Sequence, residues 1–213
     1  MSLRINNLGG FGGGGAAAAA DITVTDITSG WVTPSSGQSG ATHTYNQVDT
    51  SGGDAIAFVT CNSSRTLTAT WSGAACTVLK GQADNTSTWI ISCPGAQTGD
   101  LIISWSAACS GAVCVIQLNN CIDEATPTYS SSSIDELDEF DMGARAYSEG
   151  GIDLWMLWID GDNPSWDDAT GFVLYPDTGR DVDAGYRLQQ PGRANVSGTC
   201  SYNLLNWAIV GLR

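Results

Sequence analysis

The sequence predicts an all-β protein, an antiparallel β-sandwich of jelly-roll-like type with an extended N-terminal arm. From Asp21 onward, short apolar segments alternate with turn-forming residues roughly every 8 to 12 residues, the spacing of sandwiches and barrels. Only 14% of the residues are charged, and Gly, Ser and Thr occur throughout, which is typical of short strands joined by tight turns. The 213 residues fit one sandwich, and a hydrophobic content of 42% with eight Trp suffices for a core.

Residues 1–20 are predicted to form a flexible Gly/Ala-rich arm. A run of Gly and a run of Ala follow four scattered apolar residues, Leu3, Ile5, Leu8 and Phe11. Such a composition does not fold alone, because it has too little apolar surface to offset the entropy of ordering. Apolar residues on a flexible arm can add a strand or a wedge to a partner. We therefore expect these four side chains to dock onto another protein.

Residues 21–213 are predicted to form the sandwich domain. In TLTATWS, Leu67, Ala69 and Trp71 fall on one face of a strand and the Thr residues on the other. The predicted strands are Ile22–Ile27, Thr42–Val48, Ala55–Cys61, Thr66–Trp71, Cys76–Leu79, Trp89–Cys93, Leu101–Trp105, Val113–Leu118, Ile152–Trp158, Gly171–Leu174, Ala184–Leu188, Gly198–Tyr202 and Asn206–Leu212.

The spacing of apolar residues changes from the alternation of strands only in the segment SSIDELDEFDM. Ser133 and Glu136 match a capping box, and Ile134, Leu137 and Phe140 recur at about helical spacing. The segment is short, so it is predicted to be a loop with at most one or two helical turns.

The charge balance bears on the class of partner. Asp and Glu number 22 against 8 Lys and Arg, a formal net charge of −14 that repels phosphate groups. We therefore expect neither nucleic-acid nor membrane binding. No apolar run approaches the roughly 18 residues that a membrane helix needs, and Gly9–Gly15 breaks any signal-peptide helix, so we expect synthesis in the cytoplasm.

Catalytic signals are weak. The one histidine, His43, lies in the alternating stretch ATHTYNQV and is predicted to face solvent on a strand, and no GxSxG elbow occurs. We therefore expect no enzyme and no bound cofactor. A glycosidase built on paired carboxylates is the remaining catalytic alternative. Its candidates are Asp135, Glu136, Asp138, Glu139 and Asp141, together with the acids of DGDNPSWDD.

The seven cysteines are an odd number, so at least one thiol stays unpaired or pairs with another molecule. Cys61, Cys93 and Cys114 end or lie within apolar strand patterns and are predicted to be small buried residues. Cys109 and Cys114 could bridge across a turn in an oxidising medium. No CxxC spacing supports a zinc site.

The segment DGDNPSWDD carries Asp160, Asp162, Asp167 and Asp168. Acidic loops in a protein of this charge are usually solvated surface. The alternative is a calcium site, since alternate oxygen ligands suit a hard cation. The match to an EF-hand is weak, because Pro164 occupies a ligand position.

Aromatic residues raise the question of carbohydrate binding. Trp31, Trp166 and Tyr175 lie near turns or loops, where they could be exposed to a sugar. Four other Trp residues lie within apolar strands and are expected in the core: Trp71, Trp89, Trp105 and Trp207.

Over residues 50–212 the chain resembles small β-sandwich structural proteins of tailed bacteriophages and prophages. Four segments carry the resemblance: the DAIAFV strand Asp54–Val59, the hairpin Trp89–Ile103, the crossing Asn120–Pro127 and the closing strand Trp207–Val210. The high cysteine content and SSIDELDEFDM depart from the pattern. No catalytic residues come with the resemblance.

The resemblance implies a virion protein made in the host cytoplasm. Its members serve as head decoration proteins, head fibres or tail-associated adhesion modules. We expect a decoration or head fibre protein whose arm docks onto the major capsid protein, as a homo-oligomer, with a trimer favoured on symmetry grounds. The alternative is a carbohydrate-binding or host-adhesion module, assisted by calcium and dependent on Trp166.

Overall fold

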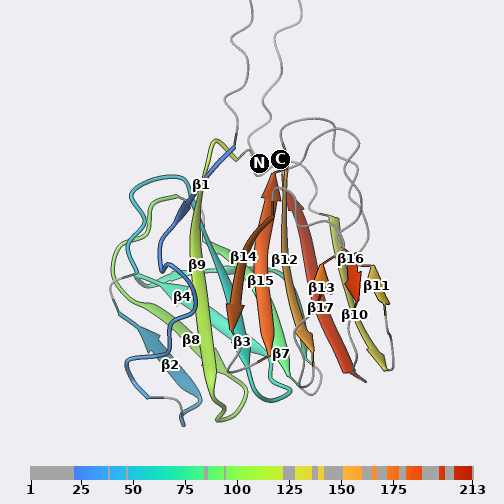
Figure 1. Cartoon of the computed structure of the whole chain (residues 1–213). Helices are drawn as coiled ribbons and strands as arrows, with labels where there is room; N and C mark the ends of the chain where they lie inside the picture. The colour runs from blue at the N-terminus through green and yellow to red at the C-terminus, as the bar shows by residue number, and fades with distance from the viewer. Residues whose placement is uncertain are drawn as a thin grey trace, which may run out of the picture.

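The computed structural model is built from β-strands (Figure 1). It describes residues 22–37, 39–46, 48–83, 86–93, 95–121, 128–135, 139–141, 151–159, 165–166, 172–177, 181–188, 197–199 and 204–212. Within these ranges there is no helix, and therefore none long and apolar enough to cross a membrane. Every strand pairing within them is antiparallel, so the prediction of an all-β antiparallel sandwich is confirmed. The jelly-roll-like arrangement and the arm stay predictions.

The strands form four sheets, here named A to D. Sheet A contains β1 (Thr23–Asp26), β9 (Gly111–Asn119), β3 (Asp54–Cys61), β7 (Ser87–Cys93) and β6 (Thr77–Ala83), in that order. Sheet B contains β2 (Thr42–Tyr45), β8 (Leu101–Trp105), β4 (Leu67–Trp71) and β5 (Ala74–Ala75). Sheet C contains β10 (Thr128–Asp135), β17 (Leu204–Leu212), β12 (Ile152–Ile159), β15 (Val182–Leu188) and β14 (Phe172–Asp177). Sheet D contains β11 (Glu139–Asp141), β16 (Ser197–Thr199) and β13 (Ser165–Trp166).

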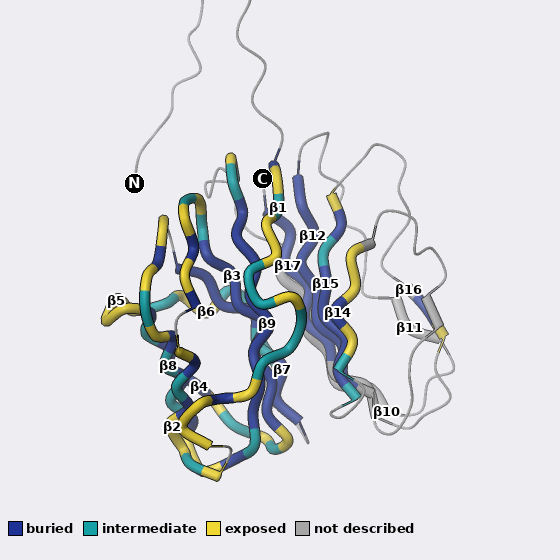
Figure 2. The backbone as a smooth tube through the Cα atoms, turned by 60° about the vertical axis from the view of Figure 1, so that its left-hand side comes forward, coloured by how far each residue is buried: buried dark blue, intermediate teal, exposed yellow. Residues whose placement is uncertain are grey.

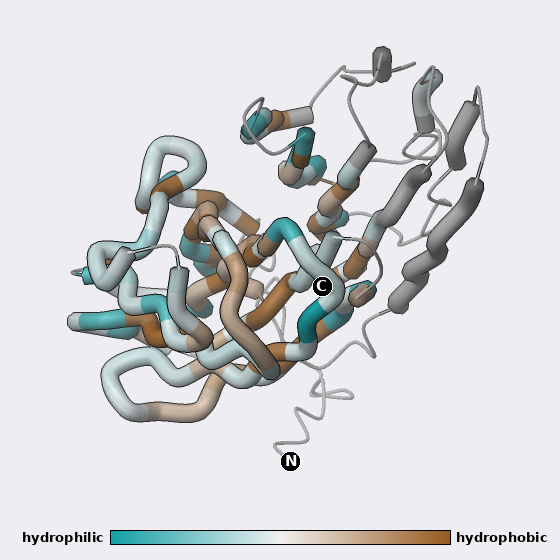
Figure 3. The backbone as a smooth tube through the Cα atoms, turned by 90° about the horizontal axis from the view of Figure 1, so that it is seen from below, coloured by the Kyte–Doolittle hydropathy of each residue, from teal (hydrophilic) through white to brown (hydrophobic). Residues whose placement is uncertain are grey.

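Sheet A is the middle layer, between sheet B and sheet C (Figure 2). Side chains alternate along β3, so Ile56 and Phe58 pack with Leu154 of sheet C, whereas Ala57 packs with Trp71 of sheet B. Both faces of β3 and β9 are therefore buried, which explains why DAIAFVTC and GAVCVIQL are almost continuously apolar. Hydrophobic segments lie in the strands between the layers, and the surrounding loops are mostly neutral or hydrophilic (Figure 3).

Each half of the chain forms its own sheets. Strands before residue 122 make sheets A and B, and strands after residue 127 make sheets C and D. Among the described strands, no pairing joins the two halves. They are held together by the side chains of one shared core, in which sheet A packs on sheet C. Side-chain packing, and not backbone hydrogen bonding, therefore decides how the halves associate.

The expectation of a loop with helical turns in SSIDELDEFDM is wrong where the structure describes this segment. Thr128–Asp135 is strand β10, and Glu139–Asp141 is strand β11. Strand β10 pairs over its whole length with β17, from Thr128 opposite Gly211 to Asp135 opposite Leu204. A full ladder of backbone hydrogen bonds outweighs one short helical pattern, because the local helical preference amounts to only tenths of a kcal/mol per residue, about 0.7 at most.

Candidate functional site

The one histidine lies inside the molecule, at the interface of sheets A and B. His43 is on β2 and is 0% exposed. The indole Nε1 of Trp105, at the end of β8, donates a hydrogen bond to Nδ1 of His43 at 3.0 Å. On the other side of the ring, Nε2 lies 3.1 Å from the carbonyl oxygen of Cys109. Because Nδ1 must accept, the tautomer that satisfies both contacts carries its proton on Nε2 and donates it to Cys109.

The prediction that His43 faces solvent is therefore wrong. The alternation of β2 places His43 and Tyr45 toward the core, and a buried ring is tolerated when both of its nitrogens are hydrogen-bonded. Gly111 makes the room, since a Cβ there would lie 2.9 Å from Nδ1 of His43. Burial lowers the pKa of His43, so the ring is neutral near pH 7.

Two free thiols are buried in the same core as the histidine's neighbours. Cys109 accepts the hydrogen bond of His43 through its backbone oxygen, and Cys61 ends β3 and donates its S–H to the carbonyl oxygen of Ser63 at 3.1 Å. Burial, and after it the neighbouring Cys61, raise the pKa of Cys109 to about 12, although Arg65 acts to lower it. Both thiols are buried in the core between sheets A and B.

This arrangement resembles a cysteine–histidine pair in composition but not in chemistry. A nucleophilic cysteine needs a lowered pKa and a base that can take its proton. Here the pKa of Cys109 is raised, and both imidazole nitrogens are already bonded, to Trp105 and to a backbone carbonyl. No local sequence pattern indicates the cluster, because His43 and Cys109 are 66 residues apart.

The cysteine predictions have mixed outcomes. Cys61 and Cys114 are free and buried, as expected. Cys93 is also buried but forms a disulfide with Cys76. A bridge between Cys109 and Cys114 is absent, because the two side chains lie on opposite faces of sheet A. Cys114 packs toward sheet C, whereas Cys109 packs toward sheet B.

The predicted calcium ligands Asp160, Asp162, Asp167 and Asp168 lie outside the described residues, so the calcium site stays a prediction. In the part of the chain that the structure describes, no group of three or more His, Cys, Asp or Glu side chains is arranged to hold a metal ion. The docking residues Leu3, Ile5, Leu8 and Phe11 also lie outside the described residues.

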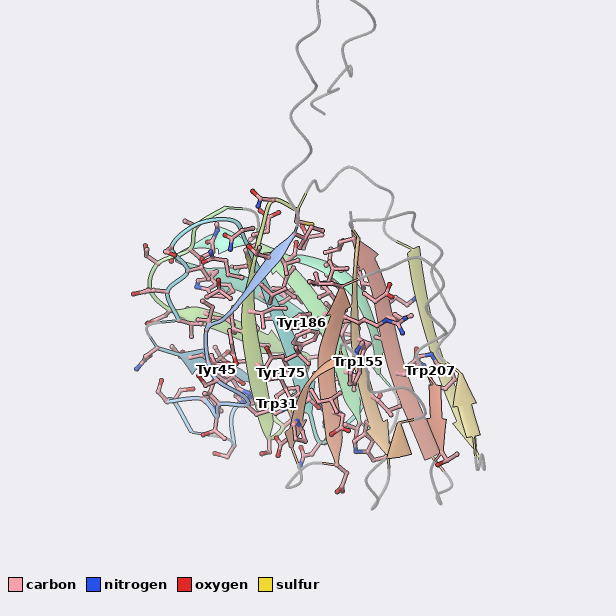
Figure 4. The ribbon with its side chains drawn as sticks, turned by 45° about the horizontal axis from the view of Figure 1, so that its top comes forward. Trp31, Tyr45, Trp155, Tyr175, Tyr186 and Trp207 are labelled. Carbon is pink, nitrogen blue, oxygen red and sulfur yellow. A yellow bond between two sulfur atoms is a disulfide. The ribbon has the colours of Figure 1, made fainter. Side chains whose placement is uncertain are left out.

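An aromatic cluster lies at one edge of the interface between sheets A and C (Figure 4). The indole Nε1 of Trp31, in the loop after β1, donates to the carbonyl oxygen of Tyr175 on β14 at 2.7 Å. The rings of Tyr175 and Tyr186 lie 6.4 Å apart between centroids. Burial and the nearby carboxylate of Asp26 raise the pKa of both tyrosines. Trp31 and Tyr186 are half-buried and pack against the core between sheets A and C.

The other aromatic predictions can now be placed. Tyr175 is buried, so the expectation that it could be exposed is wrong: its strand alternation points it into the core with sheet A. Trp71, Trp105 and Trp207 are buried as expected, and Trp89 is partly buried. Trp166 is described only as part of strand β13.

A buried ion pair lies on sheet C, and the sequence carries no signal for it. Arg187 Nη2 lies 3.2 Å from Asp153 Oδ2, and their side chains are 3% and 1% exposed. They are direct cross-strand partners on β15 and β12. They alternate with core residues such as Leu154, so they lie on the face of sheet C away from sheet A. Only the register of the two strands brings them together.

Comparison with known proteins identifies no relative. No protein-family model, no curated protein and no solved structure matches this chain.

Proposed function

We propose that the chain is a structural protein of a bacteriophage particle, a capsid decoration or head fibre protein. The observation that carries the proposal is the strand order of the two facing sheets A and B. Sheet A has the order β1-β9-β3-β7-β6 and sheet B the order β2-β8-β4-β5, so the chain crosses repeatedly between them, and β1 and β9, the first and last strands of these two sheets, are neighbours. We interpret this order as a jelly roll, an architecture that recurs in viral capsid and lectin domains.

The attachment of the arm supports the same role. Strand β1 is an edge strand of sheet A, and Ile22 just before it is buried in the core shared with sheet C. Residues 1–20 precede this edge strand in the chain, so docking of the arm onto a partner would leave the domain itself undisturbed. The net charge of −14 suits an outer position, away from packaged DNA. The neutral, fully bonded His43 supports a role without catalysis.

The test uses particles of the phage that encodes the chain. We expect the full chain to co-sediment with particles that lack it, and a variant starting at residue 21 to fold but not to co-sediment. A sharper pair compares Leu3, Ile5, Leu8 and Phe11 changed together to Ser with a matched control, Asn6 and Asn7 changed to Ser. Only the first should lose attachment. Full attachment of both, or absence of the chain from purified particles, would reject the proposal.

A second candidate is a carbohydrate-binding or host-adhesion module, which the half-buried aromatic residues Trp31 and Tyr186 favour. Sugars stack on exposed aromatic faces, and jelly rolls are also common in lectins. A glycan array would separate the candidates, with calcium present and absent. Signals that fall in Trp31→Ala, Tyr186→Ala or Trp166→Ala would support adhesion, and a blank array would remove it.

Assembly completes the proposal. Decoration and fibre proteins act as closed symmetric oligomers, and we propose a homotrimer that docks on the major capsid protein. Light scattering on the full chain measures the oligomer mass directly. A monomer at micromolar concentration would contradict the homotrimer but not the docking onto the major capsid protein.

A further inference from the structure

The two halves of the chain have the same strand order. Sheet A has the order β1-β9-β3-β7-β6, and sheet C has the order β10-β17-β12-β15-β14. If β1 corresponds to β10, β3 to β12, β6 to β14, β7 to β15 and β9 to β17, the first order becomes the second. The outer sheets follow the same rule, because β2-β8-β4 of sheet B corresponds to β11-β16-β13 of sheet D. Strand β5 has no counterpart among the described residues. Each half is therefore a sandwich of the same topology.

The residue register of the two inner sheets also agrees. The central positions are Phe58 opposite Cys114 and Ile90 in the first half, and Met156 opposite Ala208 and Ala184 in the second. If Phe58 is taken as equivalent to Met156, the neighbouring pairs of both ladders follow in step. All six side chains belong to the core between sheets A and C. The two halves therefore present equivalent faces to each other.

Short sequence matches lie at the equivalent positions. Residues 52–59 read GGDAIAFV, and the equivalent residues 150–157 read GGIDLWML. On the edge strands, Lys80 lies opposite Ile90 and Tyr175 lies opposite Ala184, so these two positions correspond. Each of them follows the dipeptide Val-Leu. The agreement of sequence, register and strand order indicates two repeats of one unit.

The outer faces of the inner sheets correspond as well. Ala55 lies opposite Cys93 in the first half, and Asp153 lies opposite Arg187 at the equivalent positions in the second. Cys93 is buried under sheet B, where it forms the disulfide with Cys76. Asp153 and Arg187 are buried on the side of sheet C where sheet D lies (Figure 2). A disulfide in one unit thus takes the place of an ion pair in the other.

The two units meet in a reciprocal way. At one edge of their interface, β6 of the first unit contacts β10 of the second. At the other edge, Trp31 in the loop after β1 donates a hydrogen bond to the carbonyl oxygen of Tyr175 on β14, at 2.7 Å. Since β1 corresponds to β10 and β6 to β14, both edges join the same two elements with their roles exchanged. This is the pattern of a two-fold symmetric dimer, in which one surface binds its own copy.

The composition of the interface fits the same interpretation. The core between sheets A and C consists of apolar side chains from both units, such as Phe58 and Leu154, and the described strands of the two units share no backbone pairing. Permanent dimer interfaces are similarly apolar and resemble a domain core cut in half. A monomeric sandwich has no need of such a face on its outside.

We infer that the chain is a tandem repeat of one sandwich unit, and that the face of sheet A toward sheet C is a recognition surface for a second such unit. Residues 22–121 and residues 128–212 bind each other as two separate molecules would. The segment between them acts by raising their effective concentration. The inference goes beyond the proposed function and does not depend on it.

The experiment cuts the full chain between the two units. A protease recognition sequence is inserted between Glu124 and Ala125, and the folded protein is cut, unfolded in urea without reductant and diluted into buffer. We expect the fragments to recombine into a 1:1 complex with the mass and the circular dichroism spectrum of the uncut chain. The matched control carries the same insertion between Ser72 and Gly73, inside the first unit. Its fragments should not recombine, because that cut divides sheets A and B between them.

A pair of substitutions in the chain cut after Glu124 tests the surface itself. Phe58→Asp places a charge in the core between the units, so we expect the fragments to bind each other at least about 100-fold more weakly. Each fragment should keep its own spectrum, because this face is at the surface of a separated unit. Thr68→Asp, on an exposed position of strand β4, is the control and should leave the binding unchanged.

The outcomes that overturn the proposal are specific. Fragments that refold without binding each other contradict it, as does recombination no better than that of the fragments cut after Ser72. Binding that Phe58→Asp and Thr68→Asp weaken equally would place the contact elsewhere. If the fragments aggregate on dilution, the two halves are co-expressed as separate chains, and halves that fail to co-purify overturn the proposal as well.

Discussion

The two cores of the molecule share sheet A but are built differently. Toward sheet C the central strands present large side chains, such as Ile56, Phe58 and Leu118. Toward sheet B strand β3 presents small ones, Ala55 and Ala57 among them. Sheet B makes up the volume with its own large aromatics: Tyr45, Trp71 and Trp105.

The difference shows how one strand can serve two interfaces. Interiors are packed to nearly constant density, so a small residue on one sheet needs a large one opposite. The A–C core is apolar and joins the two halves of the chain, whereas the A–B core contains the disulfide, two free thiols and a hydrogen-bonded histidine. Substitutions that create a cavity should therefore lower the free energy of unfolding most in the A–C core. Substitutions that add volume should lower it most in the A–B core.

The largest effect is expected for Phe58→Ala, which empties the A–C core. Phe58 is 0% exposed, so the substitution removes a whole ring and leaves a cavity. We expect the free energy of unfolding to fall by about 3–5 kcal/mol, measured by urea denaturation. Val78→Ala on the exposed edge strand β6 is the control and should change it by less than about 0.5 kcal/mol.

A smaller effect is expected for Ala57→Leu, which overfills the A–B core beneath Trp71. Three added carbon atoms have no space at a fully buried site, so we expect a loss of about 1–3 kcal/mol in the same measurement. Ala74→Leu in the exposed strand β5 is the matched control, with almost no loss. If Ala57→Leu left the free energy of unfolding unchanged, the A–B core would be loosely packed. The contrast between the two cores would then be weaker.

The smallest effect is expected from the protonation of His43. Its pKa is lowered in the folded state, so below about pH 6.5 the unfolded chain binds a proton that the folded chain does not. Stability should therefore be fully present above that pH and decrease as the pH falls through it, by at most about 1.4 kcal/mol per pH unit. The difference in stability between the wild type and His43→Gln, followed from pH 8 to pH 5, isolates this contribution from the carboxylates. A difference independent of pH would contradict the buried neutral ring.

Much of the fold was predictable because strand signals are local. The alternation in LTATW and the apolar run of AIAFVTC identified β4 and β3 within about a residue of their ends. The strand β10 was missed because its middle is a run of Ser, with neither alternation nor β-branched residues, and its stability comes from pairing with β17. Of the site, the burial of Cys61 was predictable from its apolar strand, but the inward orientation of His43 was not.

The sequence by itself determined the class of protein: an all-β chain of marked negative charge, with short strands joined by tight turns. These properties follow from residue type and spacing, which act over a few positions. Only the tertiary structure decided which strands share a sheet, that sheet A is buried on both faces, and which side chains meet across it. The contacts of His43 with Trp105 and of Asp153 with Arg187 depend on strand register and on the stacking of sheets. Those are set by the free energy of the whole packed core, and no short stretch of sequence contains that information.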